Sequence, residues 1–373
     1  MIGFDRFWFS KIRDRILLND RFRSFIESSI IFKPFIRAQA NEIFDLVSGF
    51  VYSQILYACV SLDLFEKLRH GPITLETLSK SCGIEFLEMK RLIDGAAALG
   101  LLEKRQEGLI GLGYKGVVIL TKPSISVLVK HHSTLYEDLI DPVKILKGKD
   151  KSTSLGKFWP YAQDHQNDTS QISPEVARRY SDVMSISQPL ISEQICLTYA
   201  FYKHKKILDL GGGQATFVIN LAKNYPQPKM TVFDLPQVSK IAEEKILESG
   251  FQDRIDVCQG SFFKDSIPNG YDLVTLIRVL YDHSDDNVRT ILAAVKKSLP
   301  PAGSLLIAEP MSGIPGTEKM SDAYFGMYLL AMGKGVPRSH DKIHRLLRQA
   351  GFSSTRSLKV TLPIQTGLIV AKA

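Results

Sequence analysis

The chain has 373 residues, 45% of them hydrophobic and 23% charged, which is typical of a globular protein with two domains or with one domain and a large appendage. The formal net charge of +8 allows attraction to nucleic acid or anionic lipid but selects neither. The cysteines lack the paired spacing of a disulfide framework or a zinc site, which argues against both and favours a reducing cytoplasm. They are Cys59, Cys82, Cys196 and Cys258.

Residues 1–40 are predicted to form a basic amphipathic arm, because Lys and Arg outnumber Asp and Glu there and aromatic residues lie between them. Such a helix either packs on its own protein or lies in the interface of an anionic membrane, and the sequence leaves both open. The uncharged run Leu46–Leu62 falls short of the roughly 20 apolar residues that a spanning helix needs. A buried helix is therefore expected there, and no membrane crossing.

Residues 41–140 are predicted to form a winged-helix-like domain of helices joined by short turns. Thr74 is placed to cap one helix, and Gly83 is placed to end it before a second helix. The run of residues 108–120 (GLIGLGYKGVVIL) is typical of small strands and predicts the wing. Residues 141–200 are predicted to be a linker with bridging helices.

The same helix–turn–helix pattern, over residues 72–105, occurs in DNA-binding regulators, which is an alternative function. The second helix begins GIEFLEMKR, so Glu85 and Glu88 lie at the end that would face DNA. Their negative charge would repel the phosphates of a duplex. No nucleic-acid partner is therefore expected.

Residues 201–373 alternate short β-branched runs with helical periodicity, which predicts an α/β fold with a parallel sheet and helices on both faces. The last twenty residues offer two strands around a turn, suited to an antiparallel edge. Ser284 is predicted to cap a helix with Asp285 and Asp286 in its first turn, which is a structural role for these acids.

A glycine-rich turn follows the first strand of this part. Gly211 and Gly213 allow backbone amides to approach a ligand closely, whereas Thr216 stands where a dinucleotide fingerprint needs a glycine. Asp209 suits a ligand with a positive amine, and Asp234 ends the next strand, where a carboxylate can accept two ribose hydroxyls. An amine and a ribose without a pyrophosphate predict S-adenosyl-L-methionine as the cofactor.

Further cofactor contacts are expected where later strands end. Ser261 and Phe262 follow the third strand, where an adenine would be bracketed by a hydrogen bond and an apolar cover. Leu235, directly after the ribose acid, and Arg278, at the end of the fourth strand, complete the predicted cofactor-binding set. No metal site is expected.

From about residue 40 to its end, the chain resembles the class I S-adenosylmethionine-dependent O-methyltransferases of the caffeate and hydroxyindole type. The stretches that carry this resemblance are ILDLGGGQATF, TVFDLPQV, GSFF, IRVLYDHSDD, LLIAEPM and RQAGF. The similarity is greater to the bacterial carotenoid branch, the demethylspheroidene (hydroxyneurosporene) O-methyltransferases. Its stretches are FDLVSGFVYSQILYACVSLDLFE, LGKFWPYA, YSDVMSISQPLISEQI and RVLYDHSDD.

The resemblance implies a Rossmann-like seven-stranded methyltransferase sheet and an N-terminal α-helical winged-helix domain that forms a homodimer. It implies methyl transfer to the tertiary 1-hydroxyl of an acyclic hydroxycarotenoid in a photosynthetic bacterium. The expected location is the cytoplasm, with peripheral contact to the photosynthetic (inner) membrane if the arm is interfacial. A C-methyltransferase acting on a bacteriochlorophyll precursor stays open, because that branch also carries a tyrosine near position 281.

The resemblance also directs attention to the polar residues that follow the fourth strand. In plant-type relatives the general base is a histidine, and Tyr281 occupies that position. Glu309 matches one of the two acids that steady this base, whereas Pro337 stands in place of the other. An aliphatic tertiary alcohol is much less acidic than a phenol, so Tyr281 is predicted to orient the hydroxyl and His283 or Asp282 to take the proton late.

The substrate wall is predicted from residues 322–332 (DAYFGMYLLAM), because methionine and aromatic side chains suit a long apolar slot. Such a stripe also occurs in ordinary cores, and both interpretations stay open. The predicted substrate-lining residues are Met184, Tyr324, Met327 and Tyr328.

Overall fold

The computed structural model describes residues 13–148, 152–158, 185, 188–189, 191–360 and 366–373. The chain divides into two compact units between Thr121 and Lys122. Of the predicted site residues, Met184 lies outside the described part of the chain.

The first unit contains helices around a small antiparallel sheet of strand order β1-β3-β2. As predicted, Thr74 caps the helix that follows it, accepting a hydrogen bond from the Thr77 amide, and Gly83 ends that helix in the left-handed conformation. The elements are α2 (Asp20–Ser28), α3 (Lys33–Ser61), α4 (Leu64–Lys67), β1 (Ile73–Thr74), α5 (Leu75–Cys82), α6 (Phe86–Ala98), β2 (Leu102–Lys104), η1 (Gln106–Gly108), β3 (Leu109–Leu112) and α7 (Tyr114–Thr121).

The expected strands over residues 108–120 are only partly correct. Strand β3 is present, but the β-branched run after it forms helix α7. A side chain at Gly116 would collide with the Leu101 carbonyl, so glycine there lets this helix pack directly on the backbone. Tertiary packing therefore overrides the strand preference of Val117 and Val118.

Helix α3 contains the apolar run that was expected to be too short to span a membrane. At 29 residues, with a mean hydropathy of 1.5 in its most apolar window, α3 alone among the described helices is long and apolar enough to cross a membrane. Only 11% of that window is buried, and Leu46 and Phe50 are 83% and 72% exposed, so the expectation of a buried helix is wrong for the chain as described. Length and composition alone do not decide whether the helix crosses a membrane. The absence of a membrane crossing stays a prediction.

The second unit contains the predicted sheet, and its seven strands run in the order β11-β12-β8-β7-β4-β5-β6. The five strands from β8 to β6 are parallel, and β12 pairs antiparallel with both of its neighbours, which confirms the predicted edge. The strands are β4 (Lys206–Leu210), β5 (Lys229–Asp234), β6 (Ile255–Gln259), β7 (Leu273–Ile277), β8 (Ser304–Glu309), β11 (Ser354–Leu358) and β12 (Gly367–Lys372).

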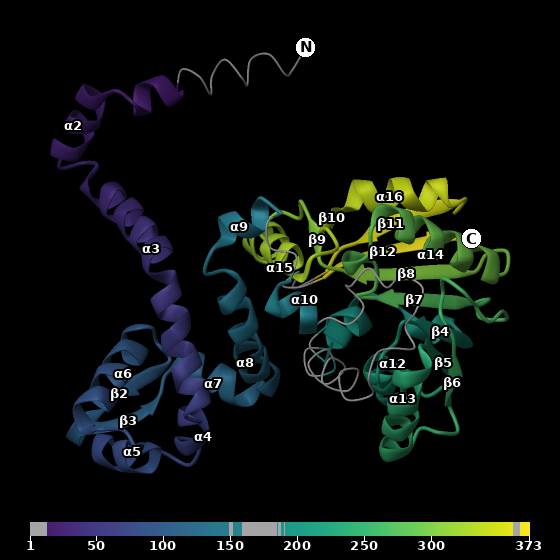
Figure 1. Ribbon diagram of the computed structural model, residues 1–373, viewed down its shortest axis with the longest axis horizontal. Coiled ribbons are helices and arrows are strands. Elements are labelled where there is room, and N and C mark those ends of the chain that lie inside the picture. The colour runs from purple at the N-terminus through teal and green to yellow at the C-terminus, as the bar shows by residue number, and fades with distance from the viewer. Residues whose placement is uncertain (1–12, 149–151, 159–184, 186–187, 190, 361–365) are drawn as a thin grey trace. The chain divides into compact units, whose positions relative to one another are not determined.

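Helices cover both faces of this sheet, with α14 and α16 on one side and α12 and α13 on the other (Figure 1). Strands β9 (Met311–Ser312) and β10 (Arg338–Ser339) form a separate parallel pair. The helices are α8 (Pro123–Asp138), α9 (Pro142–Leu146), α10 (Ser154–Phe158), η3 (Phe201–Lys203), α12 (Thr216–Asn224), α13 (Pro236–Ser249), η4 (Leu280–Asp282), α14 (Asp285–Ser298), the π-helix η5 (Lys319–Tyr324), α15 (Phe325–Met332) and α16 (His340–Gln349).

Helices α8 and α10 pack on each other and on α15. The part of the chain that follows residue 122 therefore belongs with the second unit, whereas the sequence suggested a boundary at residue 140. Packing on α15 is the physical reason for the earlier boundary.

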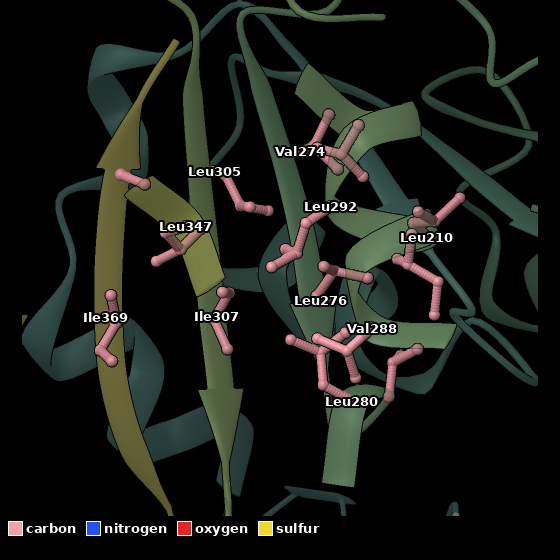
Figure 2. Packing of buried hydrophobic residues seen from close by; sticks show 14 of the residues in the cluster. Leu210, Val274, Leu276, Leu280, Val288, Leu292, Leu305, Ile307, Leu347 and Ile369 are labelled. Atoms are coloured by element: carbon pink, nitrogen blue, oxygen red, sulfur yellow. The ribbon is translucent and has the colours of Figure 1, made fainter. Parts of the chain in front are cut away.

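Along the central strands, successive side chains point to opposite faces of the sheet, and each face forms an apolar layer with the helices that cover it. In β8, Leu305 and Ile307 pack with α14 and α16, whereas Leu306 and Ala308 pack with α12 and α13. Figure 2 shows the first layer, in which Leu276 lies between the strands and helix α14. Because both faces are covered, these strands are continuous apolar runs, which is what parallel sheets require.

We expect Leu276→Ala to lower the free energy of unfolding by about 2–5 kcal/mol, because the side chain is fully buried and its loss leaves a cavity. Urea denaturation measures this change. Leu247→Ala is the matched control, since Leu247 is 67% exposed and should change stability by about 0.5 kcal/mol at most. Equal effects of the two variants would contradict the layer assignment.

Candidate active site

Near the end of β4, a buried carboxylate lies beside the glycines of the following turn. Asp209 Oδ1 accepts a hydrogen bond from the Thr275 hydroxyl at 2.6 Å, while Oδ2 is buried and has no hydrogen-bond partner among the described residues. A Cβ at Gly212 would lie 2.6 Å from this Oδ2. Burial raises the pKa of Asp209 to about 7, opposed by the Thr275 hydroxyl. The free oxygen is suited to a cationic group of a ligand.

The backbone of this turn requires its glycines. Gly211 and Gly213 have φ values of 71° and 59°, in the region that favours glycine. A Cβ at Gly211 would also lie 2.9 Å from Val279, whereas one at Gly213 would meet nothing within 4 Å. The turn therefore leaves open space at Gly213, which fits a ligand that approaches the backbone.

Asp234 ends β5 and faces the glycine turn. Its Oδ2 accepts the Gly213 amide at 2.8 Å, and its Oδ1 accepts the Leu235 amide at 2.7 Å. Burial raises the pKa of Asp234 to about 6, and these two amides oppose the rise. Each carboxylate oxygen keeps a second lone pair, which is what a ribose diol needs.

The end of β6 lies beside these two turns, because the Gly260 amide donates to the Asp234 carbonyl at 2.9 Å. The Phe262 ring lies 3.9 Å from where a Gly211 Cβ would stand. Ser261 is engaged locally, since its hydroxyl oxygen accepts the Phe263 amide. The structure thus brings the predicted acids, glycines and adenine-covering residues to one edge of the sheet.

The loop after β7 is held by Glu309, at the end of β8. Glu309 is 1% exposed and accepts the backbone amides of Val279, Leu280 and Tyr281 at 2.9, 2.7 and 3.3 Å. Burial raises the pKa of Glu309 to about 8, and these amides oppose the rise. Its carboxylate therefore positions the backbone before Tyr281, whereas the family resemblance suggested contact with a catalytic base.

Tyr281 is 2% exposed and its ring packs edge-on against Phe325 of α15. Burial raises the pKa of its phenol, while the charge of Arg278 and a hydrogen bond from that side chain oppose the rise. Arg278 itself has a φ of 59°, a strained conformation for a residue with a side chain. Tyr281 is thus a buried, neutral phenol under the influence of the Arg278 side chain.

His283 follows Tyr281 but lies in different surroundings. Its ring packs edge-on against Phe262 and Phe263, with centroid distances of 5.8 and 5.5 Å. Burial lowers its pKa, and the Asp282 carboxylate, 3.8 Å away, opposes this. The ring therefore braces the aromatic pair after β6, and its role as a proton acceptor stays a prediction.

The acids after His283 have the predicted structural positions. Ser284 caps α14 by accepting the Asn287 amide, which confirms the predicted cap. Asp285 pairs with Arg338 and Lys342 at 2.9 and 2.6 Å, and both partners lower its pKa, Lys342 most. Arg338 also donates to the Leu280 and His283 carbonyls, so it ties the loop to β10.

Two histidines of α8 lie beside the predicted substrate wall and were missed by the sequence reasoning. His131 and His132 form hydrogen bonds with the hydroxyls of Tyr328 and Tyr324, at 2.7 and 2.8 Å. Tyr328 packs in one apolar cluster with Tyr281, and Tyr324 packs against that cluster. The adjacent histidines were the available signal, but no local motif connects them to residues almost 200 positions later.

Comparison with known proteins is consistent with this geometry. Residues 136–353 match the O-methyltransferase domain, and residues 44–119 match the O-methyltransferase dimerisation domain. The chain is 35% identical over 362 residues to demethylspheroidene O-methyltransferase of Cereibacter sphaeroides, covering 97% of this chain and 94% of that protein. It is 36% identical over 358 residues to the protein of the same name in Rhodobacter capsulatus, covering 96% and 88%.

Among solved structures, human N-acetylserotonin methyltransferase in complex with SAM shares the fold, with a TM-score of 0.74 and 22% identity over 90% of this chain and 97% of that one. The dimerisation domain supports formation of a homodimer. With a matching family domain over more than half of its length and relatives similar over nearly all of it, the chain belongs to the S-adenosylmethionine-dependent O-methyltransferase family.

Proposed function

We propose that this protein transfers the methyl group of S-adenosylmethionine to the tertiary 1-hydroxyl of an acyclic hydroxycarotenoid. The observation that carries this proposal is the similarity, over nearly the whole chain, to two demethylspheroidene O-methyltransferases. The apolar and aromatic surroundings of Tyr281 support it, because a carotenoid needs an apolar wall beside its hydroxyl group.

The cofactor would be held at the carboxyl ends of β4, β5 and β6. The free Oδ2 of Asp209 would receive its ammonium group, Asp234 its ribose hydroxyls, and Phe262 its adenine face. When bound, the cofactor supplies a methyl group already activated by a sulfonium. The remaining residues assigned to its surroundings are Gly211, Gly213, Leu235, Ser261 and Arg278.

Tyr281 would align the substrate hydroxyl. Because the phenol is neutral, its own O–H is available to donate to the substrate oxygen. Glu309 accepts the amide of this tyrosine and the two amides before it, and thereby positions the tyrosine. Alignment and exclusion of water carry much of the rate, up to roughly 7–11 kcal/mol for well-oriented reactants.

The experiment that tests the function is incubation of the full chain with methyl-labelled S-adenosylmethionine and several acceptors, followed by identification of the products by mass. The acceptors are acyclic 1-hydroxycarotenoids, a simple phenol and a bacteriochlorophyll precursor. Label is expected in the carotenoid as a methyl ether. Label only in the pigment precursor would support the C-methyltransferase alternative, and label only in the phenol would contradict the proposed substrate.

Tyr281→Phe should lower kcat about tenfold to a hundredfold, because it removes a hydrogen bond worth about 1–3 kcal/mol to the reacting oxygen. Cofactor affinity measured by calorimetry should stay within about twofold. Tyr271→Phe is the matched control, since Tyr271 donates to Thr231 at 2.9 Å inside the sheet region and away from the loop after β7. Wild-type turnover in Tyr281→Phe would contradict the assigned role.

Cofactor affinity should rise with pH and level off above about pH 7. Asp209 has a pKa of about 7 in the ligand-free chain, so the carboxylate that attracts the ammonium is lost as the pH falls below this value. Calorimetry between pH 6 and 8 measures the change, which approaches tenfold per pH unit at the acidic end. Asp209→Asn should bind more weakly at neutral pH and lose most of this slope. An unchanged slope in Asp209→Asn would contradict the assignment.

We also propose that residues 13–37 contact an anionic membrane, from which the apolar substrate is drawn, so that the enzyme is cytoplasmic and peripheral on the inner membrane. This segment precedes the dimerisation match, and its apolar side chains are exposed, with Phe25 at 64% and Ile31 at 84%. Exposed basic side chains accompany them and suit anionic lipid. They include Arg13, Arg15, Arg21, Lys33 and Arg37.

The double variant Phe25→Glu with Ile31→Glu should reduce flotation with phosphatidylglycerol vesicles about tenfold or more. It removes two apolar side chains worth about 1.5–3 kcal/mol each on burial and adds negative charge. Leu247→Glu, an exposed apolar residue of α13, is the control and should float like the wild type. Equal flotation of the double variant would contradict membrane contact through this segment.

A further inference from the structure

Two similar histidine–tyrosine pairs connect α8 to the π-helix η5 and to helix α15. His132 Nε2 lies 2.8 Å from the Tyr324 hydroxyl, and His131 Nε2 lies 2.7 Å from the Tyr328 hydroxyl. The pairs differ in exposure, because His131 and Tyr328 are both buried, whereas His132 and Tyr324 are both partly accessible. The second pair is therefore the more accessible of the two.

Tyr324 lies near the reacting end of the proposed site. Its ring centroid lies 5.1 Å from that of Phe325, and the Phe325 centroid lies 6.2 Å from that of Tyr281. The charge of Arg278, which follows β7, acts on both the Tyr281 and the Tyr324 hydroxyl. Tyr324 also ends the π-helix, an irregularity that often occurs at functional sites.

We propose that His132 accepts the proton of the substrate hydroxyl, through the hydroxyl of Tyr324. The inference rests on the proposed methyl transfer and names the destination of its proton. With its own proton on Nδ1, the His132 imidazole accepts from Tyr324 at Nε2, so the Tyr324 oxygen presents its lone pairs to the substrate. Tyr281, a neutral phenol, donates to the substrate oxygen.

The step balances in atoms and charge. The substrate oxygen forms a bond to the methyl carbon while the carbon–sulfur bond breaks, and that electron pair stays on sulfur. The substrate proton passes to the Tyr324 oxygen as the Tyr324 proton passes to His132 Nε2. One positive charge is lost at the sulfonium and one is gained at the imidazolium, so the site keeps its net charge.

The electrostatic surroundings agree with this route. Burial lowers the pKa of His132, which keeps it neutral and able to accept a proton, and burial raises the pKa of Tyr324 against the charge of Arg278. Among the described residues, the titratable groups against the pair include His131, whose pKa burial lowers to about 4, Tyr136, whose ring lies 6.4 Å from that of His132, and Tyr328, whose ring lies 5.7 Å from that of Tyr324. Of the described groups named here, Arg278 is the one that brings positive charge toward Tyr324.

The test compares His132→Gln with His131→Gln in the full chain, using the acceptor that the wild type methylates best. Glutamine keeps a hydrogen-bond acceptor for the tyrosine but does not take a proton at neutral pH. His132→Gln should lower kcat about 100-fold to 1000-fold and abolish the acidic limb of the kcat–pH profile, with KM and cofactor affinity within about twofold. His131→Gln should keep the acidic limb.

If His132 has a purely structural role, His132→Ala should lose activity and His132→Gln should restore it. A near wild-type kcat in His132→Gln, with an intact acidic limb of the kcat–pH profile, would therefore overturn the proposal. Failure of the wild type to methylate any hydroxycarotenoid while methylating a phenol would overturn the proposed substrate instead, and the comparison then uses the phenol. NMR of the His132 imidazole nitrogens reports the tautomer of this ring, and it tests the proposal without a measurement of turnover. A neutral Nδ1–H tautomer of His132 at pH 7 supports the proposal, and a protonated or Nε2–H ring would overturn it.

Discussion

The carboxylate of Glu309 is the constraint on which the reactive part of the molecule depends. A buried carboxylate is costly unless it is hydrogen-bonded, and this one accepts three consecutive backbone amides from the neighbouring strand's loop. The contact joins the end of β8 to the loop after β7. These contacts hold the loop with Tyr281 packed against Phe325 of α15, and Arg338 binds the other side of the loop through two carbonyls.

Three buried acids are concentrated at one edge of the sheet. Asp209, Asp234 and Glu309 all lie where parallel strands end, and burial raises the pKa of each. Glu309 and Asp234 are satisfied by amides, whereas Asp209 keeps one oxygen without a partner among the described residues. This edge is thus prepared for a ligand that brings positive charge to one position and hydroxyls to another, which agrees with the cofactor of the family.

The tyrosines around the reacting position are neutral phenols, since burial raises the pKa of both Tyr281 and Tyr324. A neutral phenol donates and accepts hydrogen bonds but is a poor base. In the mechanism proposed above, two tasks are separated, with orientation by Tyr281 at the end of β7 and proton acceptance by His132 on α8. This separation suits an aliphatic alcohol, which releases its proton only as the methyl bond forms.

Much of the sheet edge that carries the proposed cofactor site could be predicted from local sequence. The strand, glycine turn and helix around Gly211, the acid at Asp234 and the cap at Ser284 each depend on neighbouring residues, so pattern and spacing identified them. Local pattern failed at α7, because the close approach of Gly116 to the Leu101 backbone comes from packing between elements. The compact units divide at residue 121, whereas local pattern suggested residue 140, because α8 and α10 pack on α15.

By itself, the sequence determined the α/β order, the glycine turn and its two acids, since these are set within short stretches of chain. Only the tertiary structure decided that Glu309 holds a backbone loop, that His283 packs on phenylalanines and that His132 meets Tyr324, 192 residues away. The physical reason is that a side chain's hydrogen-bond partner depends on which elements are brought together by burial of the apolar layers. No spacing along the chain records that contact.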